Sequence, residues 1–319
     1  MPVVDWPLDQ LVEYRPPLTR EPDFPAFWAE ARAELAAVPV SGEAERVAYP
    51  CEAVAVYTLR YAGWAGQPVT AWYLLPAPFL RAGPRLPAVV VYHGYSASRG
   101  TVSDHLHWVM QGYAVLAVDT RGHTGDTPDC STPAGGQYIG QMTRGVLDPR
   151  GYYYRAVFLE ALRAVQWLRQ QPEVDPGRIV ATGLSQGGGV ALAVAALDGS
   201  LAAALPDVPF LCHFRRAVDA HFDGPYREII EYLKRRPEHF ERVYRTLSYF
   251  DVMNLAPLVR CPVLCSVALL DTVCPPSTVY AAFNHLGGPR EMRVYPYSGH
   301  EGGGSLQTEE KIRFLKALL

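Results

Sequence analysis

The chain is predicted to have an α/β fold, with a mostly parallel sheet covered by helices on both faces. From residue 86 onward, short apolar runs such as "LPAVVVY" alternate with longer segments such as "AVFLEALRAVQWL", whose apolar residues recur at helical spacing. This alternation is typical of the strand–helix–strand units that build parallel sheets. The chain has 319 residues, of which 49% are hydrophobic, and this size suits one large α/β domain spanning residues 1–319.

The N-terminal part is expected to differ from the rest. Residues 1–40 contain a Pro-rich extended arm, "YRPPLTREP", followed by a helix, "DFPAFWAEARAELAAV". Residues 45–77 alternate apolar and polar side chains, which predicts antiparallel strands joined at "GWAGQ". The edges of these strands and the aromatic residues Tyr61, Trp64 and Trp72 either face a partner subunit or pack on their own chain.

The remaining elements follow in order along the chain. Strands are expected at "LPAVVVYHG", "AVLAVDTRG", "RIVATGL", "PVLCSVALLD" and "EMRVYPYSGH". Helices are expected at "SDHLHWVMQGY", "GYYYRAVFLEALRAVQWLRQQ", "GGGVALAVAAL", "PSTVYAAFNHLG" and "TEEKIRFLKALL". The strand–helix rhythm stops between about residues 213 and 258, where the pattern indicates an insertion made of helices.

Composition excludes several classes of partner. The formal net charge is −3, the isoelectric point is near 6.3 and no basic run is present, so neither nucleic acid nor an anionic membrane is expected to bind. No apolar stretch approaches the ~20 residues of a membrane helix, and the first residues lack the pattern of a signal peptide. The six cysteines have no C-x-x-C spacing, which favours a reduced, cytoplasmic protein.

One short motif points to chemistry. The segment "GLSQG" places Ser185 between an apolar strand pattern and a small-residue helix pattern. In that context G-x-S-x-G is a nucleophile elbow, a tight turn that exposes a serine hydroxyl at the end of a strand. The alternative is a glycine-rich turn that merely contains a serine, because the bare motif is common.

A serine nucleophile needs a base and an acid further along the chain. Of the nine histidines, only His300 follows the last predicted strand, in the glycine-rich loop "YSGHEGGG". Asp271 ends the preceding strand, and the prolines after it would hold its loop rigid. His300 is therefore expected to take the proton of Ser185, and Asp271 to orient the imidazole. Asp251 is the alternative acid.

An acyl-transfer site also needs two N–H donors for the developing oxyanion. The residue after the nucleophile, Gln186, supplies one. The loop after the strand Val89–Tyr92 is expected to supply the other, and we assign it to the backbone N–H of Tyr95, which would also line the substrate pocket.

With these residues in place, the chain resembles the acetyl xylan esterase and cephalosporin C deacetylase group, carbohydrate esterase family seven. The resemblance runs nearly end to end and includes "HGY", "DTRG", "GVLDPRGYYYRAV", "GLSQGGG", "RTLSYFD", "DTVCPPSTVYAAFN" and "YPYSGHEGGG". It implies an α/β-hydrolase fold with a helical cap at about residues 213–258. It also implies removal of acetyl groups from sugars and from cephalosporin C, without metal or cofactor.

The same resemblance implies a triad of Ser185, Asp271 and His300, oxyanion donors at Tyr95 and Gln186, and a ring-like homohexamer. In one place the chain departs from the family. The family usually has Arg-Gly-Gln after the "DT" strand, whereas this chain has Arg121-Gly122-His123. His123 can still donate a hydrogen bond, and unlike glutamine it can also titrate. It is expected to support the site.

Other functions remain as alternatives. A serine peptidase or long-chain lipase could use the same fold, although peptidases of this fold often carry a propeller domain for which the chain has no length. A dehalogenase would need aspartate at position 185, and a dienelactone hydrolase would need cysteine. A non-catalytic scaffold of this fold usually lacks a triad member, whereas this chain has all three candidates.

Overall fold

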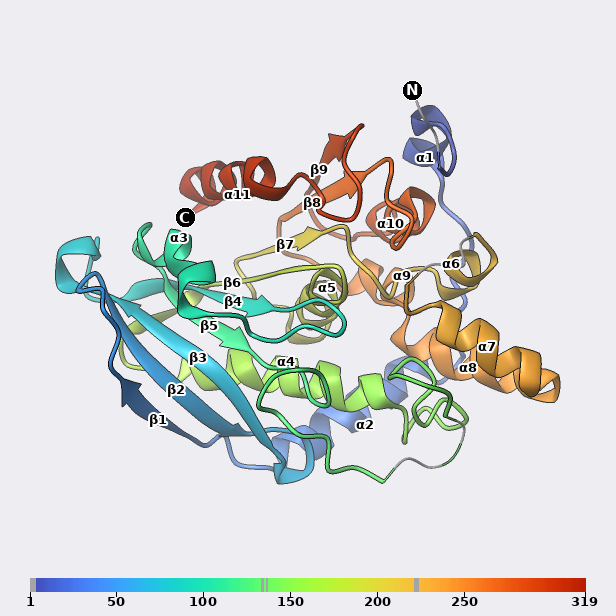
Figure 1. The fold of residues 1–319 in the computed structure, drawn as a ribbon, viewed down its shortest axis with the longest axis horizontal. Coiled ribbons are helices and arrows are strands. Elements are labelled where there is room, and N and C mark those ends of the chain that lie inside the picture. Colours follow the sequence, from blue (N-terminus) through green and yellow to red (C-terminus); the bar gives the residue numbers. More distant parts are fainter. Residues whose placement is uncertain (1–3, 133–134, 136, 221–223) are drawn as a thin grey trace.

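The computed structural model describes residues 4–132, 135, 137–220 and 224–319. These residues form one nine-stranded sheet in the order β1-β2-β3-β5-β4-β6-β7-β8-β9 (Figure 1). Strands β4 to β9 pair in parallel, as expected for strands linked by crossover helices. Their bounds are Leu86–Tyr92 for β4, Ala114–Val118 for β5, Val174–Leu184 for β6, Ala203–Asp207 for β7, Val263–Ala268 for β8 and Arg290–Tyr295 for β9.

The antiparallel part precedes the parallel part, as the alternation of residues 45–77 predicted. Strands β1 (Gly42–Val47), β2 (Val54–Ala62) and β3 (Pro68–Pro76) form a meander, and β3 joins the main sheet by pairing antiparallel with β5. Two strands were not expected from the sequence. One is β1, whose mostly exposed residues carry little apolar signal, and the other is β7, which has only five residues and includes a proline.

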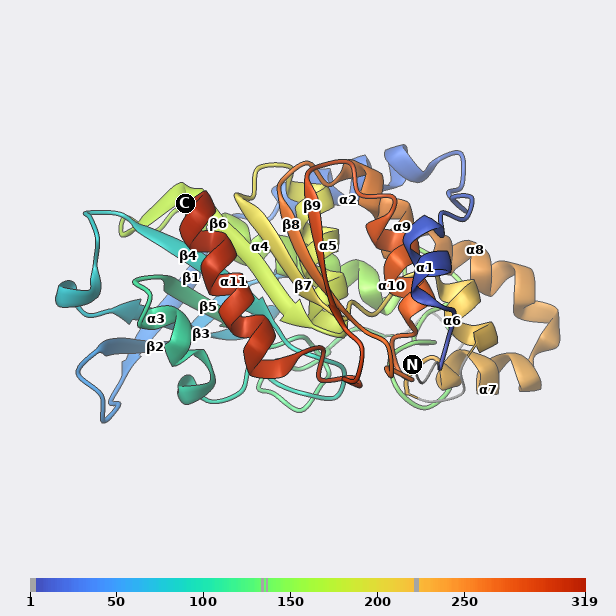
Figure 2. The same ribbon diagram turned by 90° about the horizontal axis from the view of Figure 1, so that it is seen from above.

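Helices cover both faces of the sheet (Figure 2). α3 (Leu106–Val109) and α11 (Gly304–Leu318) lie on one face, whereas α2 (Phe24–Ala36), α4 (Tyr153–Arg169) and α5 (Gln186–Asp198) lie on the other. Two separate apolar clusters correspond to these faces, with Trp108 and Leu315 in one and Phe158 and Val190 in the other. The predicted two-sided α/β architecture is confirmed.

A helical segment follows β7, where the strand–helix rhythm stops. It comprises α6 (Phe214–Ala220), α7 (Arg227–Arg235), α8 (Phe240–Phe250) and α9 (Val252–Leu255). α6, α7 and α8 gather at the end of the molecule remote from β1–β3 (Figure 1). After β8 the chain forms α10 (Pro276–Phe283). Short 3-10 turns lie at Trp64–Gly66, Pro78–Leu80, Val102–His105, Pro237–His239 and Ala256–Leu258.

The N-terminal arm packs on its own chain. A short helix, α1 (Leu8–Glu13), precedes the extended Pro-rich part, and the side-chain amide of Asn284 donates to the backbone oxygens of Leu11 and Tyr14 at 3.2 and 2.8 Å. Further along the arm, the backbone N–H of Thr19 donates to Asn254 Oδ1 at 3.0 Å. The arm thereby binds the helices that follow β7 and β8.

The aromatic residues of the antiparallel part also find partners within the chain. Tyr61 is buried and its hydroxyl donates to the backbone oxygen of Glu160 at 3.0 Å. The indole N–H of Trp72 donates to the oxygen of Gly100 at 2.9 Å, and Trp64 packs under the guanidinium of Arg155. All three aromatics thus make contacts within their own chain, while Trp64 and Trp72 stay partly exposed.

Among the described residues, none of the helices combines the length and apolar character needed to span a membrane.

Candidate active site

Ser185 lies at the sharp turn between β6 and α5, as the G-x-S-x-G motif predicted. Its backbone has φ 58° and ψ −119°, a conformation that is strained for a residue with a side chain. The glycines at 183 and 187 are required, because a Cβ at either position would collide with the backbone oxygen of Tyr92. Two backbone hydrogen bonds hold the turn in this conformation. The Ser185 N–H donates to the backbone oxygen of Asp207, and the backbone oxygen of Ser185 accepts from the Phe210 N–H, both at 2.9 Å.

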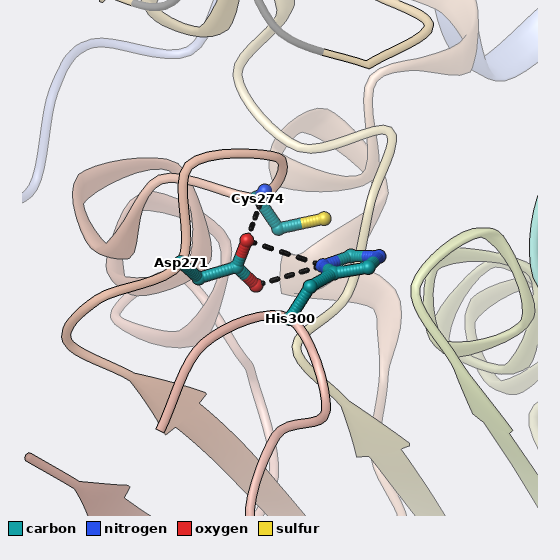
Figure 3. A group of neighbouring side chains, drawn as sticks. All are labelled: Asp271, Cys274 and His300. Atoms are coloured by element: carbon teal, nitrogen blue, oxygen red, sulfur yellow. Dashed lines mark hydrogen bonds and ion pairs between the residues drawn. The ribbon is translucent and has the colours of Figure 1, made fainter. Parts of the chain in front are cut away.

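Asp271 and His300 meet at the C-terminal edge of the sheet. Asp271 follows β8 and is fully buried, and His300 follows β9 and is about one-third exposed. His300 Nδ1 lies 2.9 Å from Asp271 Oδ2 (Figure 3). Since a carboxylate only accepts, Nδ1 carries the proton and Nε2 has the free lone pair of a base. The N–H groups of Val273 and Cys274 hold Asp271 Oδ1 at 2.8 and 2.9 Å.

Cys274 connects this pair to the serine. Its Sγ lies 3.9 Å from Ser185 Oγ, and it belongs with Asp271 and His300 to a group whose polar atoms lie within 4.8 Å of one another. Among the described residues, Ser185 Oγ makes no hydrogen bond to His300. Catalytic hydrogen bonds of unliganded enzymes are often long and shorten only around substrate. The assignment of the three residues as a triad stays a prediction.

Asp251, the alternative acid, has a different task. It begins α9, and its carboxylate accepts backbone N–H groups from His213 at 2.7 Å and from Phe214 and Met253 at 2.9 Å. Burial raises its pKa to about 6. Because His300 contacts Asp271 instead, the geometry favours Asp271 as the orienting carboxylate.

The loop that carries Tyr95 lies against the serine. A methyl group on Gly94 would be 3.9 Å from Ser185 Cβ. The neighbouring His93 fixes the loop, because its Nε2 accepts the Thr120 N–H at 2.9 Å, leaving Nδ1–H to donate to Gly94 O at 2.7 Å. The Gln186 N–H is at the first position of α5, where a helix provides no acceptor. Gln186 thus follows Ser185 directly and the residue before Tyr95 lies next to it, whereas the assignment of the two N–H groups as oxyanion donors stays a prediction.

His123 contacts the side chain of Gln186. Its Nε2 lies 3.1 Å from Gln186 Nε2 and 3.2 Å from Oε1, and the hydroxyl of Tyr154 donates to Oε1 at 2.8 Å. The His123 ring also stands edge-on to the Tyr95 ring, with centroids 4.9 Å apart. Burial, aided by His93, lowers the pKa of His123 to about 4, so the imidazole is neutral at neutral pH. His123 therefore supports both residues assigned as oxyanion donors.

Glu228 is a neighbour of the site that the sequence did not reveal. It comes from α7, and its Oε1 accepts the hydroxyl of Tyr95 at 2.7 Å, while its Oε2 accepts the Met142 N–H at 2.9 Å. The Gln141 N–H donates to the same Tyr95 hydroxyl at 2.6 Å. Burial raises the pKa of Glu228. On an amphipathic helix a glutamate usually lies on the solvent-exposed face, so the sequence around Glu228 did not indicate that this glutamate contacts the site.

The fold and this site define the class. A parallel sheet extended by an antiparallel meander, with a strained serine after a central strand and an Asp–His pair after two later strands, is an α/β-hydrolase. Solved structures that share 16, 18 and 19% identity with the chain show the same fold. The chain belongs to the acetyl xylan esterase family, because the family model "Acetyl xylan esterase (AXE1)" matches residues 1–318.

Individual relatives agree with this assignment. An acetyl xylan esterase from Paenibacillus sp. R4 is 45% identical, with a TM-score of 0.95 over 98% of this chain and 100% of that one. Acetyl xylan esterase 1 from Thermoanaerobacterium sp. JW/SL YS485 is 33% identical, with a TM-score of 0.92 over 98 and 99%. The acetyl esterase Axe7A from Xylanibacter ruminicola is 28% identical over 89% of this chain, which spans only 64% of that relative's length.

Proposed function

We propose that this protein is a serine esterase that removes acetyl groups from acetylated xylo-oligosaccharides and related sugars. The observation that carries the proposal is the Asp271–His300 pair at the same sheet edge as the strained Ser185 turn, in a chain that belongs to the acetyl xylan esterase family. The relatives named acetyl xylan esterase and acetyl esterase support acetyl esters as the substrate class.

The geometry suits an acyl-enzyme mechanism. His300 Nε2 takes the proton of Ser185 as Oγ attacks the ester carbonyl, and Asp271 stabilises the imidazolium through Nδ1. The N–H groups of Tyr95 and Gln186 bind the oxyanion. The imidazolium then gives its proton to the departing sugar oxygen. Water, activated by the same base, releases acetate from Ser185.

Three finer features belong to the same proposal. Cephalosporin C is a second acetyl ester that the family resemblance supports. A cytoplasmic location is supported by the six cysteines, which are all free thiols. A homohexamer is supported by the resemblance and by β1, an edge strand that is exposed along most of its length.

Replacing two of the proposed catalytic residues tests the mechanism. Ser185→Ala should abolish hydrolysis of p-nitrophenyl acetate and labelling by a fluorophosphonate, and Asp271→Asn should lower kcat by about 10⁴. The surface variant Ser103→Ala is the matched control and should behave like the wild type. Substantial turnover by folded Ser185→Ala protein would exclude Ser185 as the nucleophile. A folded wild-type protein without turnover or labelling would contradict the esterase proposal.

A panel of esters tests the substrate class. Acetyl esters should be preferred, and rates should fall steeply by butyryl, because each methylene that the pocket cannot house loses about 0.8 kcal/mol of transfer free energy and adds strain. Comparable kcat/KM for acetyl and octanoyl esters would favour the lipase alternative.

A further inference from the structure

Cys274 is a buried thiol with no part in the mechanism proposed above, yet it contacts the residues that carry that mechanism. We propose that Asp271, Cys274 and His300 form a binding site for a thiophilic divalent cation such as Zn²⁺ or Cd²⁺, and that occupancy of this site switches the esterase off. The inhibitory part of the proposal rests on the proposed function, whereas cation binding does not.

The three ligands converge from two loops. One oxygen, nitrogen or sulfur atom of each residue lies within 4.8 Å of the corresponding atoms of the other two. Figure 3 shows the thiol of Cys274 and the imidazole of His300 on the same side of the Asp271 carboxylate. Asp271 Oδ1 is held by two backbone N–H groups of its own loop. Oδ2, which faces His300 at 2.9 Å, is the oxygen available to a cation.

The donor set suits zinc-like ions. Zn²⁺ prefers sulfur and nitrogen ligands, accepts carboxylate oxygen, and often has three protein ligands and one open position. Ligand atoms around a tetrahedral zinc lie roughly 3.5 Å apart, given bonds of about 2.0–2.3 Å. The His300 Nδ1–Asp271 Oδ2 pair, at 2.9 Å, must therefore open slightly, while separations near the 4.8 Å limit must shorten by about 1 Å, so the His300 ring has to shift. His300 can supply this movement, because it is one-third exposed and lies in a glycine-rich loop, whereas Asp271 and Cys274 are fully buried.

Cation binding has a definite chemical consequence. A metal–sulfur bond replaces the S–H bond of Cys274, and the thiol proton leaves to solvent. A metal–nitrogen bond forms at His300 Nδ1, so the imidazole proton moves from Nδ1 to Nε2. With Nε2 protonated, His300 cannot accept the proton of Ser185, and the Asp271 contact that orients the ring is lost. Inhibition should therefore appear as a lower kcat, with KM nearly unchanged.

Inhibition is measured first on the full-length protein. Zn²⁺ should inhibit p-nitrophenyl acetate hydrolysis, and a chelator should restore the rate. In Cys274→Ser the inhibition constant, measured against that variant's own uninhibited rate, should rise at least about tenfold, since even outer partners of a metal site change affinity 10–100-fold. Cys130→Ser, which removes an exposed cysteine outside the cluster, should be inhibited like the wild type. Equal inhibition of wild type and Cys274→Ser would overturn the proposal.

Binding is measured separately from activity. Cd²⁺ titrated into Ser185→Ala protein should produce a thiolate-to-cadmium charge-transfer band with one equivalent bound. The band should be absent from the double variant Ser185→Ala, Cys274→Ser. In the double variant Ser185→Ala, His300→Gln the band should appear only at higher Cd²⁺ concentrations. The second substitution provides the test if the first variant does not fold. A band that neither substitution changes would refute the site. An inactive wild type that shows the expected band would contradict only the proposed function.

Discussion

At the residue scale, the site combines one strained residue, Ser185, with several buried polar partners. Ser185 has a positive φ that a serine adopts only when its surroundings impose it. The glycines on both sides and the two backbone hydrogen bonds of the turn provide that constraint. His123 differs from the other buried partners of Gln186, because an imidazole can take up a proton within the ordinary pH range.

The histidine at 123 makes stability depend on pH. Its pKa is lowered to about 4 in the folded protein by burial, whereas in the unfolded chain it is near 6.5. Between these values the unfolded chain binds a proton that the folded protein does not. The contribution of His123 to the free energy of unfolding is therefore fully present above pH 6.5 and is lost as the pH falls toward 4.

Urea unfolding of wild type and His123→Gln measures this effect. On going from pH 7.5 to 5, the wild type should lose up to about 2 kcal/mol more unfolding free energy than the variant, because each pKa unit is worth about 1.4 kcal/mol. Burial also lowers the pKa values of His107 and His213 to about 4. Both residues are present in both proteins, so their effects on the unfolding free energy cancel in the comparison. An identical loss in both proteins would show that His123 is not the group responsible.

At the element scale, helix α7 holds the Tyr95 loop through one carboxylate. Glu228 accepts hydrogen bonds from the Tyr95 hydroxyl and the Met142 N–H with different oxygens. Glutamine has only one accepting oxygen, so Glu228→Gln must lose one of the two bonds and bring an N–H group against another donor. Glu228 thus acts as a positioning residue for the proposed oxyanion loop.

Kinetics of Glu228→Gln measure this positioning. We expect kcat to fall about tenfold, equivalent to about 1.4 kcal/mol of transition-state stabilisation, with a smaller change in KM. Glu231→Gln is the matched control, because Glu231 lies on the same helix and, within the described part of the chain, its ion pairs are with Lys234 and Arg235. If both variants reduce kcat equally, the effect comes from α7 itself and not from the Tyr95 contact.

The C-terminal helix is fixed to the sheet by a buried ion pair. Lys311 of α11 pairs with Asp207 at the end of β7, and its ammonium also donates to Thr182 Oγ1 at 3.1 Å. Gln307, one turn earlier, donates to the other oxygen of Asp207 at 3.0 Å. A buried charge left without its partner is costly.

Removing the lysine should therefore be more damaging than removing the pair. Lys311→Ala should lower the free energy of unfolding by about 3–5 kcal/mol, and the double variant Lys311→Met, Asp207→Asn should recover most of that loss. Chemical denaturation measures both, with the exposed Lys316→Ala as control. A double variant as unstable as Lys311→Ala would show that lost packing of α11, and not the unpaired charge, is responsible.

At the scale of the whole molecule, assembly decides which substrates reach the site. If the proposed hexamer forms with its active sites facing an internal cavity, short acetylated xylo-oligosaccharides should enter more easily than polymeric xylan. The N-terminal arm, Tyr61 and Trp72 have hydrogen-bond partners within their own chain, and the exposed edge strand β1 is one candidate edge for a neighbour.

Light scattering and acetate release test assembly and access together. The purified protein should have about six times the mass of one chain, and oligosaccharides should release acetate much faster than polymer at equal acetyl concentration. The exposed edge of β1 can be blocked by Ala44→Pro, which should reduce the mass and the preference together. A stable monomer that deacetylates polymer as fast as oligomer would contradict both expectations.

The sequence by itself determined the α/β architecture and the order of the proposed catalytic residues. Buried strands are recognised as short apolar runs and amphipathic helices by their period, and Ser185, Asp271 and His300 each follow a recognisable strand, so chain order and fold class place them at one sheet edge. Only the tertiary structure decided which side chains meet there. Tyr95 and Glu228 are 133 residues apart, and His123 and Gln186 are 63 apart. Such contacts depend on packing between elements, which no local pattern encodes. The contact between Cys274 and Ser185 depends on that packing in the same way.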